Sequence, residues 1–336
     1  MLRYNITHIN TAAVDEPSCL FVMNNNHGSV MLTTTTDALP DAQAAPGPGQ
    51  HQSLAWVGME HIALPVDIAG RPVSARVNAG INLLADPQGG SGIHMSRLYL
   101  QLDELTQGEL TPARLRTVLA GFLASHPGRC DRASLTLSGD VLLSRRALVS
   151  AHSGWKAYPI GVEATLEKTF SLTLDVAVPY SSTCPASAAL SRHAAQSHFL
   201  QAFGDRRNGL TVAEIADWLA AAGMPATPHS QRSWAHIRLR LDPEARELPV
   251  AAAIACAEQA LGTAVQTAVK RCDERAFALA NGANLLFCED AARRLERAFQ
   301  AAAWCTAATI RVEHQESLHA HNAVAVTHWK GASDVT

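Results

Sequence analysis

The sequence of 336 residues is poor in charge and has no excess of basic residues. Charged side chains make up 17% of the chain, and the formal net charge is -3. An average soluble protein has a charged share of about 25%. The balance argues against a nucleic-acid binder, because phosphate contacts need clustered Lys and Arg. The low charge also favours self-association, which would bury further surface.

Long apolar runs and targeting segments are missing as well. The most apolar stretch, residues 250–257, is followed by Glu258. It falls short of the roughly 20 residues that a membrane helix needs. The first residues, MLRYNITHINTAAVDEPS, show no basic segment before an apolar core, so we expect no secretory signal. We therefore expect a cytoplasmic protein that binds neither nucleic acid nor membrane.

Seven cysteines and fifteen histidines are the unusual part of the composition. The cysteine number is odd, and no pair has the spacing C-x-x-C. Both facts argue against a disulfide framework and a structural zinc ribbon, so we expect mostly buried, reduced thiols. Histidine is a common metal ligand and also titrates near neutral pH. The composition is therefore compatible with a metal site or with an acid–base site.

Hydrophobic periodicity divides the chain into a flexible segment, residues 1–53, and two folded units. Residues 33–52 are rich in Thr, Ala, Pro and Gly without an apolar period, and we expect order to begin near Leu54. The first unit would span residues 54–183 and the second residues 184–336. Both run from strands through helices to strands. This order predicts an α+β fold of antiparallel sheets with helices on one face.

Local signals place the individual elements. A turn at Ala69-Gly70 would join two strands, and Thr111-Pro112 is a good helix start, with Thr as N-cap and Pro in the first turn. Residues 164–178 alternate in polarity and predict one long strand. The same patterns predict strands at 54–66, 73–84, 133–143, 234–241, 309–314 and 322–328, and helices at 248–269 and 289–303.

An additional segment, residues 187–227, interrupts the second unit. It contains a helix at 211–222 whose start carries a capping box, Thr211 with Glu214, and which ends at Gly223. We expect this segment to be an insertion or a lid.

Several polar clusters lie at the ends of expected elements and contain the candidate site residues. Cys184 follows a strand and His229 precedes one, while the spacing of His319 and His321 would put both on one face of a strand. Thiolate, imidazole and carboxylate are ligands of zinc and similar ions. From spacing alone, a packed or capping role explains a lone Cys or His more often.

Six short stretches match one family pattern, and they occur in the same order. With the family pattern in parentheses, they are 92–97 GIHMSR (GTHMSR), 184–185 CP (CPCS), 229–233 HSQRS (HNQRS), 271–274 RCDE (RPDE), 287–290 FCED (FVED) and 316–321 ESLHAH (ESIHNH). Together they resemble the type IB GTP cyclohydrolase family over most of residues 54–329. The resemblance implies a tandem tunnelling fold whose subunits assemble into a barrel, usually a homotetramer, with sites between subunits.

The resemblance also implies an activity and a cofactor. The family enzyme opens the imidazole ring of GTP at C8, releases formate and recyclises to 7,8-dihydroneopterin triphosphate, for folate and deazaguanine pathways. It uses a divalent metal, here expected to be zinc, with iron or manganese as alternatives. The implied metal ligands are Cys184, His229, Glu274 and His319. The implied catalytic residues are Cys184, His319 and His321, of which the histidines would move protons to the opening ring.

The implied substrate-binding residues are mostly basic. Glu289 matches the position that holds the N1 and N2 edge of guanine, because a carboxylate accepts from both donors at once. Without the resemblance, this residue could equally serve only to charge a helix N-terminus. His94, Arg97, Arg232 and Arg271 complete the set, with the arginines expected at the triphosphate.

The sequence departs from the family pattern beside Cys184. Ala186 replaces the second cysteine of the CPC motif, Ala188 replaces the usual Lys, and residues 187–227 stand where the family has a short connection. Two alternatives to the standard enzyme follow. The first is a purine-nucleotide hydrolase that gives a ring-opened or different product. The second is a non-catalytic tunnelling-fold protein that binds a purine.

Overall fold

The computed structural model describes residues 21–25, 28–32, 52–85, 92–206 and 208–331. Strands β1 (Phe21–Asn25) and β2 (Gly28–Leu32) pair as an antiparallel hairpin inside the segment that we expected to be flexible. Residues 33–51 of the expected linker lie outside the described residues. The first strand of the main body begins at Leu54, as predicted.

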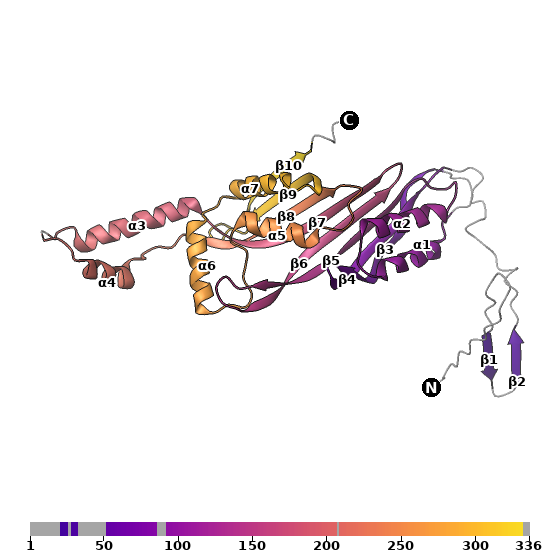
Figure 1. Cartoon of the computed structure of the whole chain (residues 1–336), viewed down its shortest axis with the longest axis horizontal. Coiled ribbons are helices and arrows are strands. Elements are labelled where there is room, and N and C mark those ends of the chain that lie inside the picture. Colours follow the sequence, from indigo (N-terminus) through magenta and orange to yellow (C-terminus); the bar gives the residue numbers. More distant parts are fainter. Residues whose placement is uncertain (1–20, 26–27, 33–51, 86–91, 207, 332–336) are drawn as a thin grey trace. The chain divides into compact units, whose positions relative to one another are not determined.

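The main body is built on one eight-stranded antiparallel sheet (Figure 1), which confirms the α+β class. Each strand pairs with its neighbours along the chain, in the order β10-β9-β8-β7-β6-β5-β4-β3. The strands are β3 (Leu54–Ile68), β4 (Arg71–Leu83), β5 (Ala133–Arg146), β6 (Ser153–Leu166), β7 (Phe170–Thr183), β8 (Ser230–Leu241), β9 (Cys305–His314) and β10 (Ala323–Lys330).

Helices lie in three of the connections between strands, and those of two connections cover one face of the sheet. Helices α2, α5 and α7 pack on the strands, and the alternate strand residues beneath them form the core (Figure 1). No helix among the described residues is long and apolar enough to span a membrane. The helices are α1 (Met95–Gln101), η2 (Leu102–Thr106), α2 (Pro112–Ala124), α3 (Pro185–Phe203), α4 (Val212–Ala222), α5 (Val250–Leu261), α6 (Arg271–Ala283) and α7 (Cys288–Gln300).

Several local signals are confirmed in atomic detail. Ala69 and Gly70 have φ values of 55° and 67°, and they form the turn between β3 and β4. The Thr111 hydroxyl accepts a hydrogen bond from the N–H of Arg114 at 3.2 Å and caps α2. The capping box of α4 is also present, with both of its hydrogen bonds between Thr211 and Glu214.

Two predicted boundaries are wrong. Residues 164–178 are not one strand, because β6 ends at Leu166, the chain turns, and Phe170 pairs back with Leu166. The helix expected at 248–269 stops at Leu261, where Gly262 takes the left-handed conformation with φ 78°. The expected boundary between the two units after residue 183 stays a prediction, since the sheet continues without a break through β7 and β8.

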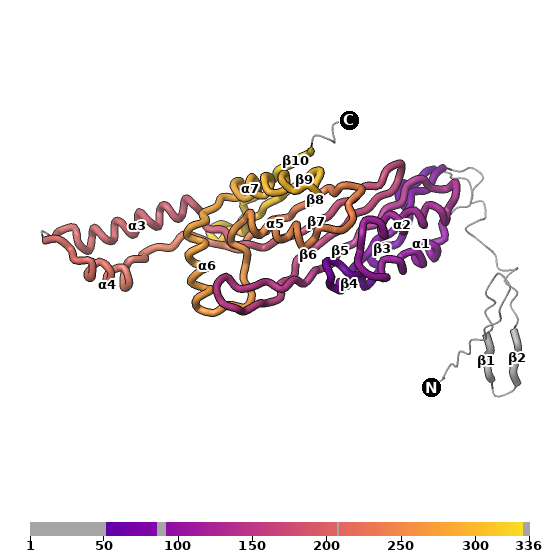
Figure 2. Tube along the Cα trace, in the orientation of Figure 1, coloured from indigo at the N-terminus to yellow at the C-terminus, as the bar shows by residue number. Residues whose placement is uncertain are grey.

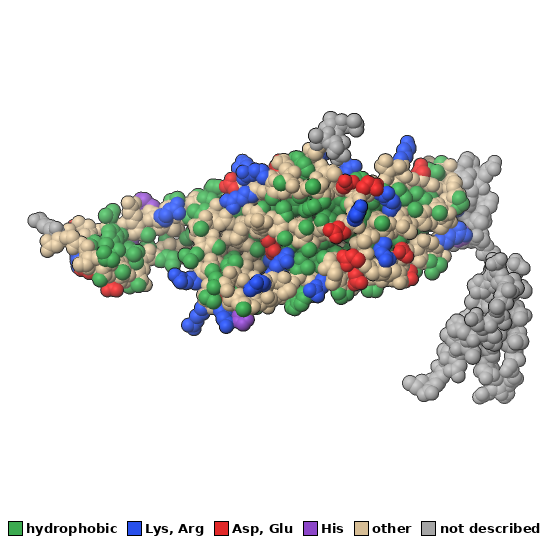
Figure 3. Space-filling model, viewed as in Figure 1, with side chains coloured by type: hydrophobic (Ala, Val, Ile, Leu, Met, Phe, Trp, Pro, Cys, Tyr) green, Lys and Arg blue, Asp and Glu red, His purple; other side chains and the backbone are tan. Residues whose placement is uncertain are grey.

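Helices α3 and α4 form a helical hairpin, residues 185–222, which we call the α3–α4 arm. The chain leaves the sheet after β7, runs out along α3, returns along α4 and re-enters as β8 (Figure 2). The rings of Phe199, Phe203 and Trp218 pack together between the two helices. Hydrophobic side chains gather over the arm in Figure 3. The exposed ones are Leu190, Leu200, Val212 and Leu219.

Candidate active site

Separate chain segments meet at the end of the sheet where β7 stops and β8 starts. The carbonyl of Thr183 accepts from the N–H of Leu286 at 3.1 Å, which draws the start of α7 to the end of β7. The N–H of Cys184 donates to the carbonyl of His229 at 3.2 Å. These contacts bring three predicted site segments together, at Cys184, at His229 and just before Glu289.

Cys184 is both a predicted site residue and the N-cap of α3. Its thiol sulfur accepts from the N–H of Ser187 at 3.5 Å. The hydroxyl of Ser187 accepts from the N–H of His229 at 3.2 Å. Because a backbone N–H donates each of these bonds, they hold the chain at Cys184 close to the chain at His229 before any ligand binds.

The imidazole of His229 lies between two acceptor side chains. Its Nδ1 is 3.0 Å from Oε1 of Gln231 and 3.4 Å from Oε2 of Glu316. The side chains of His229 and Glu316 are only 17% and 11% exposed. Glu316 is thus a site residue for which the sequence predicts no role, although it opens the 316–321 motif.

Glu289 lies in the first turn of α7, next to the buried thiol of Cys288. Its pKa is held below the ordinary value by its own backbone N–H and by the Cys288 thiol, whose sulfur is 3.3 Å from Oε2. The carboxylate is therefore ionised at neutral pH. It is exposed and can accept hydrogen bonds from a ligand.

His319 and His321 do not lie on a strand, which corrects the sequence prediction. Both are exposed in the loop between β9 and β10. Their rings nevertheless stack, with centroids 5.0 Å apart and planes inclined by 11°. The two histidines are therefore close together, as expected, but they lie in a loop and not on a strand.

Arg271 and Glu274 are exposed in the first turn of α6, a helix that the hydrophobic pattern of the sequence does not predict. Buried Asp273 between them accepts from the N–H groups of Val149 and Ser150, both at 2.8 Å, and holds this turn to the β5–β6 hairpin. The contact of α6 with β7 lies further along, where Asn281 accepts from Ser181 at 2.7 Å. Glu274 is therefore about 10 Å along the helix axis from that contact.

His94 and Arg97 are not brought to this end of the sheet within one chain. They lie at the start of α1, beside the first strands, whereas α3 begins at the opposite end (Figure 1). The N–H of His94 donates to Nε2 of buried His126 at 3.1 Å, and Arg97 donates to the carbonyl of Ser125 at 2.9 Å. Arg232 is exposed on β8, beside Gln231.

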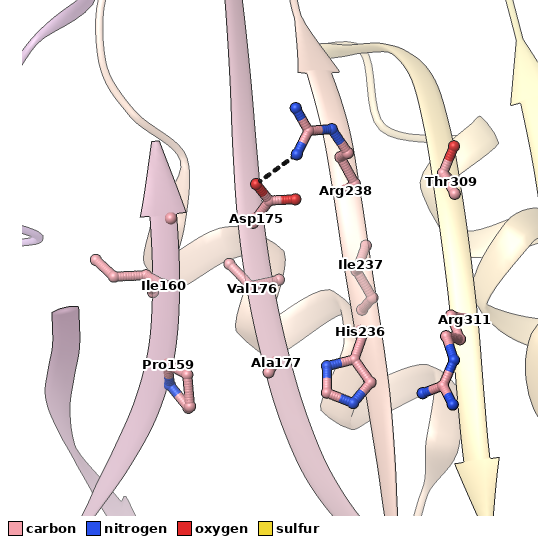
Figure 4. A pocket seen from close by; sticks show the side chains of 11 residues that line it. Pro159, Ile160, Asp175, Val176, Ala177, His236, Ile237, Arg238, Thr309 and Arg311 are labelled. Atoms are coloured by element: carbon pink, nitrogen blue, oxygen red, sulfur yellow. Dashed lines mark hydrogen bonds and ion pairs between the residues drawn. The ribbon is translucent and has the colours of Figure 1, made fainter. Parts of the chain in front are cut away.

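Figure 4 shows a hollow on the sheet whose lining is mainly apolar, includes the charged residues Asp175, Arg238 and Arg311, and contains no predicted site residue. Arg238 pairs with Asp175 at 3.0 Å and also with Glu163, while Arg311 pairs with Glu313 at 2.6 Å. Because both guanidinium groups are engaged in ion pairs of the sheet, this hollow is a weak candidate for binding a triphosphate.

Buried His314 is expected to make the stability of the protein depend on pH. Burial lowers its pKa to about 4, against a partial opposing effect of Glu289. An unfolded histidine has a pKa of about 6.5, so between these values the unfolded chain binds a proton that the fold excludes. The free energy of unfolding should therefore fall by about 3 kcal/mol as the pH drops from about 6.5 to about 4.

This prediction is tested by denaturant unfolding across that pH range, with His314→Gln as the comparison. The pKa of His126 is lowered by burial as well, so the difference between the two proteins is the useful quantity. In the variant, the free energy of unfolding should depend less steeply on pH, by the contribution of about one bound proton. Equal slopes for both proteins would contradict the assignment to His314.

Comparisons with known proteins give the same family for most of the chain. The family model described as type I GTP cyclohydrolase folE2 matches residues 39–325. GTP cyclohydrolase FolE2 of Klebsiella pneumoniae is 66% identical over 298 residues, which cover 89% of this chain and 100% of that protein. The FolE2 of Serratia proteamaculans (strain 568) is 57% identical over 299 residues, covering 89% and 97%. Uricase from Arthrobacter globiformis, a solved structure, gives a TM-score of 0.43 at 7% identity, covering 84% of this chain and 96% of that one.

Proposed function

The chain belongs to the type I GTP cyclohydrolase folE2 family, and from this premise we propose that it hydrolyses GTP at C8. The net reaction takes one water and gives formate and 7,8-dihydroneopterin triphosphate. The observation that carries the proposal to particular residues is the meeting of Cys184, His229 and the start of α7 at one end of the sheet.

The exposed carboxylate of Glu289 is the proposed guanine anchor. As an ionised group it accepts from N1–H and from the 2-amino group together, which no adenine presents in that arrangement. Since the carboxylate stands in the first turn of α7, the N-terminal end of that helix also favours its negative charge.

Cys184, His229 and Glu316 are proposed to act at the reacting carbon. They offer a thiol, an imidazole and a carboxylate, which are the donor types of a catalytic zinc site. Among the described residues of one chain, no three His, Cys, Asp or Glu side chains gather closely enough to hold a metal ion. The divalent ion therefore stays a proposal supported by donor chemistry, and so do the ligand roles of Glu274 and His319.

When bound, such an ion lowers the pKa of a coordinated water and makes hydroxide available at neutral pH. Zinc is the ion we propose, with iron or manganese as alternatives. His319 and His321 are proposed to carry protons. Elemental analysis of the purified protein tests the metal.

The remaining features are proposed from the family resemblance. His94, Arg97, Arg232 and Arg271 would bind the triphosphate, the first two from a neighbouring subunit, because one chain does not bring them near Cys184. A homotetrameric barrel, a cytoplasmic location and a role in folate synthesis belong to the same proposal. So does the description of this chain as a divergent member with Ala186 and an insertion at 187–227. Light scattering tests the tetramer.

The deciding assay incubates the protein and a divalent metal with GTP and measures formate and the fluorescence of the oxidised pterin. Formate and pterin in equal amounts would support the proposed reaction. Formate or a formamidopyrimidine without pterin would mean a hydrolase that stops at ring opening. Neither product, with GTP still bound, would mean a purine-binding protein without catalysis.

A further inference from the structure

The stripe of core-facing residues turns polar where it approaches His229. On β7 the apolar residue Val178 is followed at the next core-facing positions by Tyr180 and Ser182. On β8 the matching positions hold Gln231 and Ser233, before the apolar run resumes. All four side chains are buried, with exposures from 0% to 8%. Buried polar groups are costly unless each is paired, so the local change of character needs an explanation.

These side chains form a continuous hydrogen-bonded chain across three strands. From His229 Nδ1 it runs to Gln231 Oε1 at 3.0 Å, and from Gln231 Nε2 to Ser182 Oγ at 2.9 Å. Ser182 and Ser233 are 2.8 Å apart, and Ser233 bonds to the hydroxyl of Tyr180. The Tyr180 hydroxyl lies 2.7 Å from Nε2 of His314. We call this set the buried relay.

The direction of every bond in the relay can be read from its ends. Gln231 Oε1 and Glu316 Oε2 both face Nδ1 of His229 and can only accept, so Nδ1 must carry the hydrogen. The amide group of Gln231 then donates to Ser182, which leaves the Ser182 hydroxyl free to donate to Ser233. The same sense continues through Tyr180 to the imidazole of His314. One consistent direction therefore satisfies each member.

We propose that Gln231 is a positioning residue, which holds His229 as the Nδ1–H tautomer and so leaves Nε2 as the ring nitrogen that acts in the reaction. A hydrogen bond to one ring nitrogen is the usual way in which a protein selects the active nitrogen of a histidine. The Glu316 carboxylate explains why the amide of Gln231 does not turn over, because Nδ1 of His229 would then accept from the amide and would present a lone pair to Glu316. The part of the proposal that concerns the reaction rests on the proposed function of His229.

The tautomer can be measured directly by NMR of the whole protein labelled with ¹⁵N-histidine. The spectrum of His229→Asn identifies the His229 signals. In the wild-type protein we expect the proton on Nδ1 and an unprotonated Nε2. A proton on Nε2 would overturn the proposal, whatever the enzyme does with GTP.

Substitutions at Gln231 separate positioning from simple packing. Gln231→Leu fills the same space without an acceptor, and we expect kcat to fall about 10- to 100-fold with KM within about threefold. Gln231→Glu keeps an acceptor at Nδ1, and Ser182 can turn to donate to it. This variant should retain the tautomer and keep kcat within about tenfold of the wild-type value. The control for the added charge is Gln201→Glu, an exposed site on α3, which should leave kcat unchanged.

The outcomes distinguish the possible failures. A folded Gln231→Leu protein with wild-type kcat and the wild-type tautomer would refute the positioning role. If Gln231→Leu does not fold, the wild-type tautomer and the behaviour of Gln231→Glu still decide. A wild-type protein with the expected tautomer but without any product from GTP would refute the proposed function and leave the hydrogen-bond assignment intact.

Discussion

Cys184→Ser is expected to leave the fold intact and to lower kcat/KM for GTP by at least about a hundredfold. Serine preserves an acceptor at the N-cap of α3, where the thiol now receives the N–H of Ser187. It removes the sulfur, which is the proposed metal-binding thiolate, and a serine hydroxyl stays protonated at neutral pH. The measurements are kcat/KM by pterin fluorescence, the metal content and the thermal midpoint.

Cys184→Ala provides the matched comparison, because it removes the cap as well as the thiol. It should lose as much activity as the serine variant and, in addition, up to about 1 kcal/mol of stability. If both variants keep the metal and turn GTP over at the wild-type rate, Cys184 is only a helix cap. Loss of stability in Cys184→Ser equal to that in Cys184→Ala would also contradict the assignment of the cap.

Glu289→Gln is expected to lower kcat/KM for GTP by about 10²- to 10³-fold, mostly through KM. The glutamine amide keeps one acceptor and places an N–H₂ group against a donor of guanine, so one hydrogen bond is lost and one contact becomes repulsive. Inosine triphosphate, which lacks the 2-amino group, tests whether the loss comes from the contact between Glu289 and guanine. The preference of the wild-type enzyme for GTP over this analogue should shrink in the variant.

Asp290→Asn is the control that separates guanine binding from the charge of the helix terminus. Asp290 stands in the same first turn of α7 and pairs with Arg293 at 3.2 Å. Its loss should change stability by no more than about 0.5 kcal/mol and leave KM near the wild-type value. Equal effects of the two substitutions on KM would mean that Glu289 merely charges the helix.

The sequence was a good guide where structure is decided locally. The turn at Ala69-Gly70, the cap at Thr111 and the capping box at Thr211 each involve residues within three or four positions, and all three are present. The turn between β6 and β7 was invisible, because Leu166 and Phe170 share one parity and the alternation continues across it. Helix α6 was missed since Asp273 is its one buried residue, and this carboxylate is satisfied by a hairpin far away in the chain.

The candidate site shows the same division. The motifs that contain Cys184, His229 and Glu289 could be located from the sequence, because the family resemblance depends on short contiguous motifs. The roles of Gln231 and Glu316 could not be predicted, although both residues lie inside such motifs, because their partners include residues from other strands and loops. One signal for Gln231 is present in the sequence. It is a polar residue at a position of β8 where the alternation of side chains predicts a core-facing apolar residue.

The α3–α4 arm joins two residues that the fold already holds together. The hydrogen bond between His229 and Ser187 closes the base of the arm across a separation of 42 residues, and a second bond there joins Cys184 to His229. The entropy of closing such a connection grows only with the logarithm of its length, and a doubling costs about 0.6 kcal/mol. The arm can therefore lengthen, shorten or exchange its sequence at small cost, while the two side chains at its base keep their spacing.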